Sequence, residues 1–486
     1  MLEKSEQPKT RSSGDLIQLD EDTVLCSIST FSGGGIGDAG VEWGCKVPVI
    51  SACELVADRA GLIRHNYPKT MVFEGDIWEL KEKIIAHSKE RLGTFRPWLF
   101  VMSPPCQGMS SNGAGRLRAS IKQGKRPKQD IRNRLVLPGI DIIEQTLPDW
   151  FVLENVQRME NTVIFNERDE LENILKLIGR RLHPLGYTIK SSIIDFLDLG
   201  VPHHRKRLIT IGCRIPSVVK QIPPGEIFQK VPSLLHPVSS HGGVSQPAHI
   251  SMKEAIGHMP QLDALSKMVD EHDLYHQIPK WSKHHYFCLQ HTPEGCSAFD
   301  NNTCIKCQFS QHTANDIDCL KCGAQLPKPQ ITIEFWTCPK CATHNRKNKE
   351  KCECGFLKRD DVPIEKKRRL IKGFKTAYRR LKWDAPASTL TMNSGVISSD
   401  NKGHPDQNRV LSVREIVLLS SLQAHPGVEY PWESKYQFRS VDAKGEYFYD
   451  GDLSPRLVRQ VIGESIPPLA MYKIVSRLKE LDPRIE

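Results

Sequence analysis

The cysteines divide this chain into two regions that must be stabilised in different ways. Five of the 15 cysteines are scattered before residue 220, and the other ten lie between Cys288 and Cys354. The N-terminal stretch MLEKSEQPKTRSSGD is polar and lacks the apolar core of a secretory signal, so a disulfide framework is not expected in the cluster. We therefore expect the clustered thiols to bind metal.

Spacing within the cluster predicts two structural zinc sites, because paired cysteine knuckles supply the four thiolates of a tetrahedral site. The first expected ligand set is Cys304, Cys307, Cys319 and Cys322. The second expected set is Cys338, Cys341, Cys352 and Cys354. With Trp336 before it and Asn345 inside it, the second set resembles the small zinc fingers first described in nuclear-pore proteins, although its last two cysteines are separated by one residue instead of two. Cys288 and Cys296 leave open a third site or a shifted pairing of ligands.

Before the cluster, short β-rich runs alternate with helical stretches from Thr23 to Arg214. This alternation predicts an α/β fold built on a doubly wound, largely parallel, Rossmann-like sheet. Strands are expected at 24–29, 47–52, 98–102, 150–153, 188–194 and 207–212. Helices are expected at 77–86, 171–178 and 467–481. Sheets of this class bind ligands beyond the carboxyl ends of their strands.

The first expected strand leads into a glycine-rich turn, TFSGGGIGD at residues 30–38. Such a turn lets the backbone approach a ligand closely, although a tight turn alone would also explain the glycines. Glu54 ends the second strand about twenty residues later, where a carboxylate can bind ribose hydroxyls. Asp76 and Ile77 follow at a position suited to an adenine. Together these residues predict an adenosine-type cofactor.

Reactive groups are expected at the ends of three further strands. Two prolines place Cys106 after the strand at 98–102, where its thiol can serve as a nucleophile or simply be a structural cysteine. Glu154 follows the strand at 150–153, and Arg205 and Arg207 lie where the strand at 207–212 begins. A thiol, an acid and two arginines would then meet on one rim of the sheet.

The formal charge of +10 is distributed unevenly. Residues 116–134 contain eight Lys/Arg and one acid, a net of +7, and residues 281–384 contain 20 Lys/Arg and 11 acids, a net of +9. The remainder is therefore acidic. Two basic islands favour a polyanionic partner held at two places, although solvated loops would also explain the first island. No apolar run of 18 residues occurs, so no membrane span is expected.

Taken in order, these motifs resemble those of the cytosine-C5 methyltransferase family over residues 24–213 and 385–481. The matching segments are Phe31–Gly35, 104–107, Glu154-Asn155-Val156, Arg205-Lys206-Arg207, 385–389 and 463–468, with His404-Pro405, Arg409 and Arg414-Glu415 matching the stretch before the last. The sequence departs from the family at Ile36, His203, Ala385 and Glu464. Because it does not depart at Cys106, Glu154 or Arg205, activity is expected.

The resemblance implies S-adenosylmethionine as the cofactor. The residues it implies for cofactor binding are Phe31, Ser32, Gly33, Gly35, Glu54, Asp76, Ile77 and Ser465. It also implies that the Cys106 thiolate attacks C6 of a flipped-out cytosine, that Glu154 holds N3 and the exocyclic amine, and that Arg205, paired with Arg207, fixes O2. The basic loop 116–134 is expected to close over the DNA.

Four segments are expected along the chain. These are a flexible tail at 1–20, a catalytic domain at 21–213, a target-recognition domain at 214–384 and a closing segment at 385–486. Two zinc ribbons, at about 304–322 and 338–354, lie within the expected recognition domain. The ribbons serve as scaffold if zinc binds, and direct contact with DNA is left open.

The expected function is therefore methylation of C5 of cytosine in a specific sequence of double-stranded DNA. The protein is expected to be a cytoplasmic monomer of a microbial or viral host cell, with a cognate restriction or defence system as a further partner. One alternative is the same chemistry on RNA, but a metal-rich insertion of about 170 residues fits DNA recognition better. The other is a non-catalytic reader of nucleic acid, against which the intact set of Cys106, Glu154 and Arg205 argues.

Overall fold

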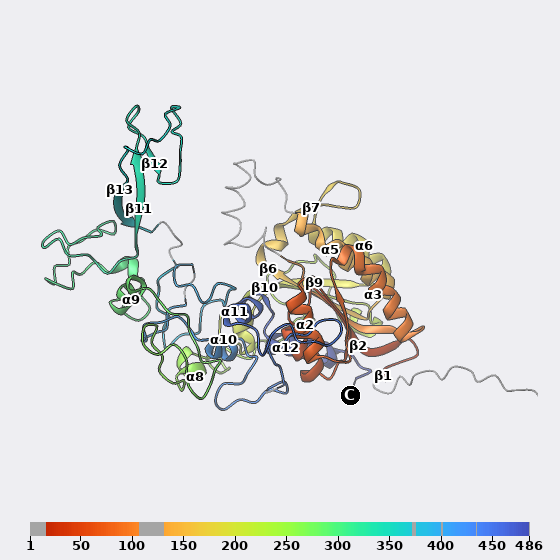
Figure 1. Cartoon of the computed structure of the whole chain (residues 1–486). Helices are drawn as coiled ribbons and strands as arrows, with labels where there is room; N and C mark the ends of the chain where they lie inside the picture. Colours follow the sequence, from red (N-terminus) through yellow and green to blue (C-terminus); the bar gives the residue numbers. More distant parts are fainter. Residues whose placement is uncertain (1–15, 106–130, 372–375, 400–401, 434, 486) are drawn as a thin grey trace, which may run out of the picture. The chain divides into compact units, whose positions relative to one another are not determined.

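The computed structural model describes residues 16–105, 131–371, 376–399, 402–433 and 435–485, and the chain divides into two compact units (Figure 1). The first, which we call the sheet unit, comprises 1–250 and 417–486. The second, the ribbon unit, comprises 251–416. None of the described helices is long and apolar enough to cross a membrane.

A mixed β-sheet organises the sheet unit. Its strand order is β4-β3-β2-β5-β6-β10-β9, and β1 pairs with β2 outside this path. The strands are β1 (Ile17–Gln18), β2 (Thr23–Thr30), β3 (Val49–Glu54), β4 (Met71–Glu74), β5 (Arg96–Met102), β6 (Trp150–Val156), β9 (Thr188–Asp195) and β10 (Lys206–Cys213). Neighbours from β4 to β6 are parallel, whereas β10 is antiparallel to both β6 and β9. Only residues 196–205 separate β9 from β10, too few for the crossover that a parallel return requires.

The chain changes its winding direction between β2 and β5. From β2 it proceeds outward to β3 and β4, and it then returns to place β5 on the other side of β2. Such a topological switch point opens a crevice at the carboxyl ends of the strands. Thr30 at the end of β2 pairs with Met102 at the end of β5. The glycine-rich turn and the Pro104-Pro105 segment therefore leave the sheet side by side.

Helices pack on the sheet through apolar side chains. The helices of this unit are α1 (Ile36–Ala39), followed by a π-helical turn (Gly40–Gly44), α2 (Ala57–Asn66), α3 (Ile77–Leu92), α5 (Val136–Thr146), α6 (Ile174–Leu182), α7 (Pro216–Val219), α11 (Pro455–Glu464) and α12 (Pro468–Leu481). α3 packs against α5, and α5 packs against α6 (Figure 1). α1 packs against α12. One cluster of fully buried residues joins α3, α5 and α6 to the central strands, as Ile84, Ile143, Leu177 and Phe151 illustrate.

Several boundaries differ from the sequence expectations. The helix expected at 171–178 begins at Ile174, because 171–173 pairs as β8 (Leu171–Asn173) with β7 (Val163–Phe165), and Asn173 then caps α6. Ile17 and Gln18, within the expected tail, pair with β2. The sequence did not predict β4, which has only four residues and lies at an edge of the sheet.

Residues 214–250 were expected in the recognition domain, but they belong to the sheet unit. The backbone of Ser191 on β9 exchanges hydrogen bonds with Ile227 (2.7 Å) and Gln229 (2.8 Å). The ring of His236 lies 3.0 Å from the carbonyl oxygen of Ile209. The segment thus extends the edge of the sheet before the chain enters the ribbon unit.

The ribbon unit has little regular structure. Its elements are α8 (Met252–Ile256), α9 (Lys283–Gln290), β11 (Gln330–Thr337), β12 (His344–Arg346) and β13 (Glu365–Leu370), and α10 (Val413–Leu419) begins at its end. β11 is the central strand of an antiparallel sheet ordered β12-β11-β13 (Figure 1).

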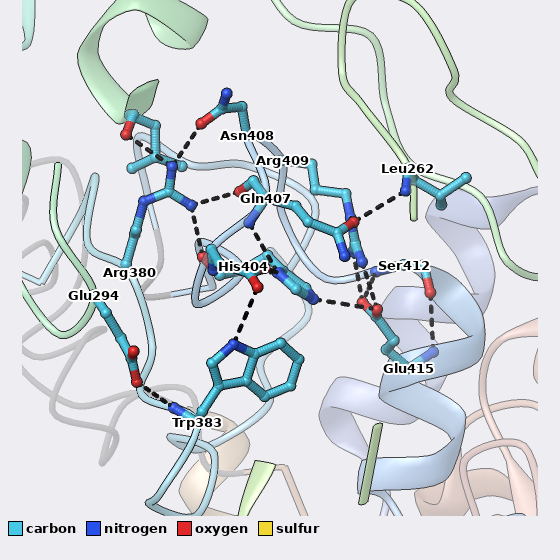
Figure 2. Close-up of polar contacts among 12 residues, drawn as sticks. Leu262, Glu294, Arg380, Trp383, His404, Gln407, Asn408, Arg409, Ser412 and Glu415 are labelled. Carbon is cyan, nitrogen blue, oxygen red and sulfur yellow. Dashed lines mark hydrogen bonds and ion pairs between the residues drawn. The ribbon is translucent and has the colours of Figure 1, made fainter. Parts of the chain in front are cut away.

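A buried polar network replaces part of an apolar core in this unit (Figure 2). Arg409 and Glu415 are both fully buried and form two hydrogen bonds of 2.7 Å. The Glu415 carboxylate also accepts from the Ser412 backbone, at 2.7 Å. The guanidinium of Arg380 donates to the carbonyl oxygens of Leu289, Thr292, His404 and Gln407 and to the Asn408 side chain. The segments around His404, Arg409 and Glu415, which resemble family motifs, therefore hold the loops of this unit in place.

Candidate active site and metal centres

The glycine-rich turn after β2 is held by the end of β3. The backbone N–H of Ser32 donates to the Cys53 carbonyl (3.1 Å), and the N–H of Gly33 donates to Glu54 Oε2 (2.9 Å). The other carboxylate oxygen of Glu54 accepts from the N–H of Val56 at 3.0 Å. Burial raises the pKa of Glu54 above its ordinary value. Glu54, which is expected to bind the ribose hydroxyls of the cofactor, therefore also holds the glycine-rich turn in place.

The turn depends on glycine where it approaches other elements. Gly35 has a φ of 73°, and a Cβ there would lie 2.7 Å from the ring of Tyr67. The Tyr67 hydroxyl donates to the Gly35 carbonyl at 2.7 Å. A Cβ on Gly34 would lie within 3 Å of Val461 and Leu62. Close packing thus explains glycine at positions 34 and 35, whereas Gly33 is favoured by its φ of 57° alone.

A buried acid lies behind the turn. Asp38 on α1 accepts from the Ser29 hydroxyl at 3.3 Å, and the Ser29 hydroxyl lies 2.9 Å from that of Ser32. Burial, followed by the charge of Glu42, raises the pKa of Asp38 to about 7. A short hydrogen-bonded chain therefore connects a titratable carboxyl to the cofactor turn. The sequence analysis missed Asp38, although an acid at the start of a helix in a buried stretch was a visible signal.

Two exposed apolar side chains adjoin, in the sequence, the residues expected to bind the adenosine. Leu55 directly follows Glu54 and is 67% exposed, and Trp78 is 40% exposed near the start of α3. Asp76 caps α3 by accepting from the N–H of Trp78 at 3.0 Å, and Ile77 is buried. Exposed apolar surface beside a polar strand end is suited to a flat heterocycle. The sequence analysis did not single out Leu55 or Trp78, although both adjoin residues that it named.

The nucleophile motif continues from the end of β5. Cys106 and the residues after it up to 130, which include most of the basic loop 116–134, lie outside the described residues. The residues before Cys106 are anchored, because the Asn155 side-chain amide donates to the Pro104 carbonyl at 3.0 Å. This bond joins the end of β6 to the Pro-Pro segment. Asn155, which the sequence analysis gave no role, therefore helps to set the direction in which the chain leaves for Cys106.

An acid and the paired arginines meet at the neighbouring strand ends. Glu154 and the guanidinium of Arg207 form an ion pair of 2.7 Å, and both side chains are largely buried. Arg205 lies two residues before Arg207 and is 2% exposed. Its backbone N–H donates to Asp195 (2.9 Å), and its guanidinium donates to the Gly463 carbonyl (3.3 Å).

The final motif reaches the same rim from the far end of the chain. Gly463 receives the bond from Arg205, and Glu464 forms an ion pair with Arg59 of α2. Ser465 ends α11, and its hydroxyl donates to the Ile462 carbonyl at 3.0 Å. The structure thus brings Gly463 to Arg205, and Glu464 to α2, the helix that follows the strand ending in Glu54. Glu464, a departure from the family pattern, gains a partner in Arg59.

Two groups of thiols in the ribbon unit fit a metal ion. The donor atoms in each group all lie within 4.8 Å of one another, and the groups are Cys304, Cys307, Cys319 and Cys322, and Cys338, Cys341, Cys352 and Cys354. The closest sulfur pairs are 3.5 Å apart in both groups. A tetrahedral zinc site with Zn–S bonds of about 2.3 Å places its sulfurs roughly 3.8 Å apart. Four thiols gathered at this spacing are therefore suited to zinc.

Each zinc group is accompanied by a very small core. Trp336 is fully buried beside Cys338, Cys352 and Val362, and its indole N–H donates to the Lys349 carbonyl at 2.8 Å. The backbone N–H of Cys354 is the main cause that lowers the pKa of the Cys352 thiol, to about 6. A cluster of this size contributes little apolar burial to the ribbon.

Within the described part of the chain, no further group of three metal-binding side chains is found. Cys288 is buried with its sulfur 3.7 Å from His284 Nε2, but this nitrogen already accepts from the backbone N–H of Gln330 at 2.9 Å. Cys296 is exposed. The third site left open by the sequence therefore has no assembled ligand set.

Comparison with known proteins agrees with these motifs. Residues 25–480 match the family of C-5 cytosine-specific DNA methylases. The chain is 25% identical over 472 residues to Type II methyltransferase M1.HgaI of Avibacterium volantium, covering 93% of this chain and 98% of the relative. It is 25% identical over 473 residues to Type II methyltransferase M.AgeI of Thalassovita gelatinovora, covering 90% and 98%. With a match that spans nearly the whole sequence, this chain belongs to the C-5 cytosine-specific DNA methylase family.

Proposed function

We propose that the rim of the sheet unit at the switch point methylates C5 of a cytosine within a specific sequence of double-stranded DNA. The observation that carries the assignment of roles is the 2.7 Å ion pair between Glu154 and Arg207, beside the bond from Asn155 to Pro104. The first holds an acid at the end of β6, and the second directs the chain that leads to Cys106. These contacts support an arrangement in which the acid and the nucleophile motif act at the same rim.

S-adenosylmethionine, the methyl donor of this family, supplies an electrophilic methyl group. The residues proposed to bind it are Phe31, Ser32, Gly33, Gly35, Glu54, Asp76, Ile77 and Ser465. Each carboxylate oxygen of Glu54 accepts one backbone hydrogen bond, from Gly33 or from Val56, so lone pairs remain for ribose hydroxyls. The exposed side chains of Leu55 and Trp78 are suited to pack on the adenine.

The proposed chemistry starts from a poorly nucleophilic carbon. The Cys106 thiolate adds to C6 of the cytosine, and Glu154 stabilises the charge that develops at N3 and the exocyclic amine. Arg205 is proposed to fix O2, and Arg207 holds Glu154 in place. C5 then takes the methyl group, with S-adenosylhomocysteine as the other product. A base removes the C5 proton, the C5–C6 double bond re-forms, and Cys106 leaves C6 as a thiolate. The cytosine must leave the helix first, which costs a few kcal/mol of unstacking.

The ribbon unit is proposed as the target-recognition domain, held by two structural zinc ions. The chain also has relatives named Type II methyltransferases, which supports a role beside a restriction enzyme of the same specificity. The recognition surface of the ribbon unit would then determine which cytosines are methylated and so protected from that enzyme.

The central test is Cys106→Ser, which should abolish methyl transfer from labelled S-adenosylmethionine while cofactor affinity is retained. Cys296→Ser is the control, because it removes an exposed thiol outside both zinc groups. Wild-type protein should also form a covalent adduct with duplex DNA that contains 5-fluorocytosine, because fluorine cannot leave as a proton does. An active enzyme that forms no adduct contradicts the assignment of Cys106, and preferential methylation of RNA contradicts the assignment of DNA.

A further inference from the structure

The three-stranded sheet of the ribbon unit has two faces of different character. In an antiparallel pair, residues opposite each other share a face, and residues alternate between faces along each strand. On β11 the even-numbered positions share one face with Lys366 and Arg368 of β13. The odd-numbered positions share the other face with Arg346 of β12 and with Lys367 and Arg369 of β13. We call these the paired face and the open face.

Cations on the paired face are neutralised by carboxylates. Glu334 forms ion pairs with Lys347 (2.8 Å) and Lys366 (3.4 Å). Arg368 donates to both carboxylate oxygens of Asp318 at 2.8 Å. At the end of this face, Trp336 is buried in the core of the second zinc ribbon. The paired face is therefore satisfied within the protein.

On the open face the cations lack such partners. Ile331, Ile333 and Phe335 form its central row; Ile331 is 37% exposed and the other two are half-buried. Arg346, Lys367 and Arg369 flank this row, and no ion pair joins any of them to a carboxylate among the residues that the structure describes.

One acid, Glu365, shares the open face with these three cations, and it forms no ion pair with any of them among the described residues. Glu365 lies at the start of β13, opposite Phe335, and its carboxylate accepts from the Thr337 hydroxyl at 2.5 Å. The Phe335 ring makes an edge contact with His344 at 4.8 Å between centroids. The open face therefore combines three cations without carboxylate partners and an accessible apolar row. A surface of this kind fits a partner that carries both negative charge and apolar patches.

Duplex DNA has this combination. Its phosphates attract Lys and Arg, and its deoxyribose and thymine methyl groups offer apolar contacts. Lys367 and Arg369 lie two residues apart, about 6.7 Å along the strand, which is close to two axial steps of 3.4 Å along one DNA strand. We infer that the open face of the β12-β11-β13 sheet binds the sugar–phosphate backbone of duplex DNA through Arg346, Lys367 and Arg369. The inference rests on the proposed function, because it names a contact surface for the same substrate.

The test uses the salt dependence of DNA binding by the full chain. The open-face variant is Arg346→Gln, Lys367→Gln and Arg369→Gln, and the probe is a fluorescein-labelled duplex of mixed sequence. Each lost phosphate contact reduces the slope of log K against log salt by about 0.9, so the slope should fall by roughly 2.7. At about 0.15 M salt each contact is worth about fivefold, so affinity should fall roughly 100-fold. The ratio of specific to non-specific affinity should stay the same, because phosphates carry no sequence.

The matched control is the paired-face variant Lys347→Gln, Lys366→Gln and Arg368→Gln. It removes the same formal charge from the same sheet, so a purely long-range effect would change both variants equally. We expect its salt slope to fall by less than 1, and zinc content and thermal unfolding show whether each variant is folded. Equal slopes for the open-face variant and wild type, or equal losses for both variants, overturn the inference. If wild-type protein methylates no DNA, the proposed function fails instead, and the slope comparison still reports on the surface.

Discussion

The two units of this chain solve the problem of stability in different ways. In the sheet unit, buried strands such as β6 pack beneath helices, and one apolar cluster joins strands and helices. In the second zinc ribbon, the buried cluster has only four members, two of which are cysteines. Apolar burial orders the sheet unit, whereas the second ribbon combines this small cluster with four thiols placed to bind a metal. The rest of the ribbon unit has a separate apolar cluster, which includes Trp281 and Leu289, and the buried ion pair of Arg409 and Glu415.

The largest effect should come from a zinc ligand. Cys319→Ser leaves three thiolates in the first ribbon, and structural zinc in small domains contributes about 10–16 kcal/mol of apparent binding free energy. We expect the ribbon to unfold and DNA methylation to collapse, while S-adenosylmethionine binding by calorimetry stays near the wild-type value. Zinc content should fall from about two ions per chain to about one. Cys296→Ser should change none of these quantities. Wild-type protein that methylates DNA without bound zinc would contradict the role of metal in the ribbon unit.

A smaller effect is expected from the ion pair buried in the ribbon unit. Glu415→Ala leaves Arg409 buried without its carboxylate, which typically costs about 3–5 kcal/mol. Glu334→Ala, which breaks half-buried or exposed pairs with lysines, should cost less than about 1 kcal/mol. Both losses in the free energy of unfolding can be measured by denaturant unfolding that is monitored through amide hydrogen exchange in residues 251–416. Equal losses for the two variants would show that the network of Figure 2 contributes nothing special.

The same pair predicts a sensitivity to acid. Glu415 is buried, which opposes ionisation, but Arg409 outweighs this effect, and the pKa of Glu415 falls to about 2. A carboxyl whose folded pKa lies below its unfolded pKa stabilises the fold above the unfolded value and loses this contribution as pH falls toward the folded value. The ribbon unit of the wild type should therefore lose stability between about pH 4.5 and pH 2, and Glu415→Ala should show a weaker loss over this interval.

In the sheet unit a buried carboxylate should matter for ligand binding. Glu54→Ala should weaken S-adenosylmethionine binding by roughly 1–3 kcal/mol, because a charged hydrogen bond and the support of the glycine turn are both lost. Glu74→Ala is a matched control at the exposed end of the neighbouring strand β4, where Glu74 pairs with Arg64. Calorimetry that finds the two variants equal would assign Glu54 to structure alone.

The last effect concerns Asp38, where burial works in the opposite direction from Glu415. Its folded pKa, about 7, lies above its ordinary value of 3.8, so the folded state prefers the protonated form. Stability should therefore decrease as pH rises, by up to about 1.4 kcal/mol per pH unit between about pH 3.8 and pH 7. Asp38→Asn keeps an oxygen that accepts from Ser29 and should remove this slope. Thermal unfolding at several pH values, with identical slopes for both proteins, would show that Asp38 does not titrate there.

Much of the fold was visible in local pattern. Six expected strands correspond to β2, β3, β5, β6, β9 and β10, because each is a buried run bounded by polar or turn residues. The four-residue edge strand β4 was missed, since so short a segment has no periodicity to detect. The boundary between the two units at residue 250 could not be predicted from composition either. Residues 214–250 look irregular, but they pair with the edge of the sheet through long-range hydrogen bonds.

The sequence by itself determined the chemistry, because cysteine spacing, the glycine turn and the order of motifs are properties of residues close together in the chain. Only the tertiary structure decided which residues meet. Arg207 reaches Glu154, Asn155 holds Pro104, and Gly463 receives a bond from Arg205 although 258 positions separate the two residues in the sequence. It also distinguished the open face from the paired face of one basic sheet. Strand pairing sets which side each cation occupies, and a one-residue change of register would exchange the two faces.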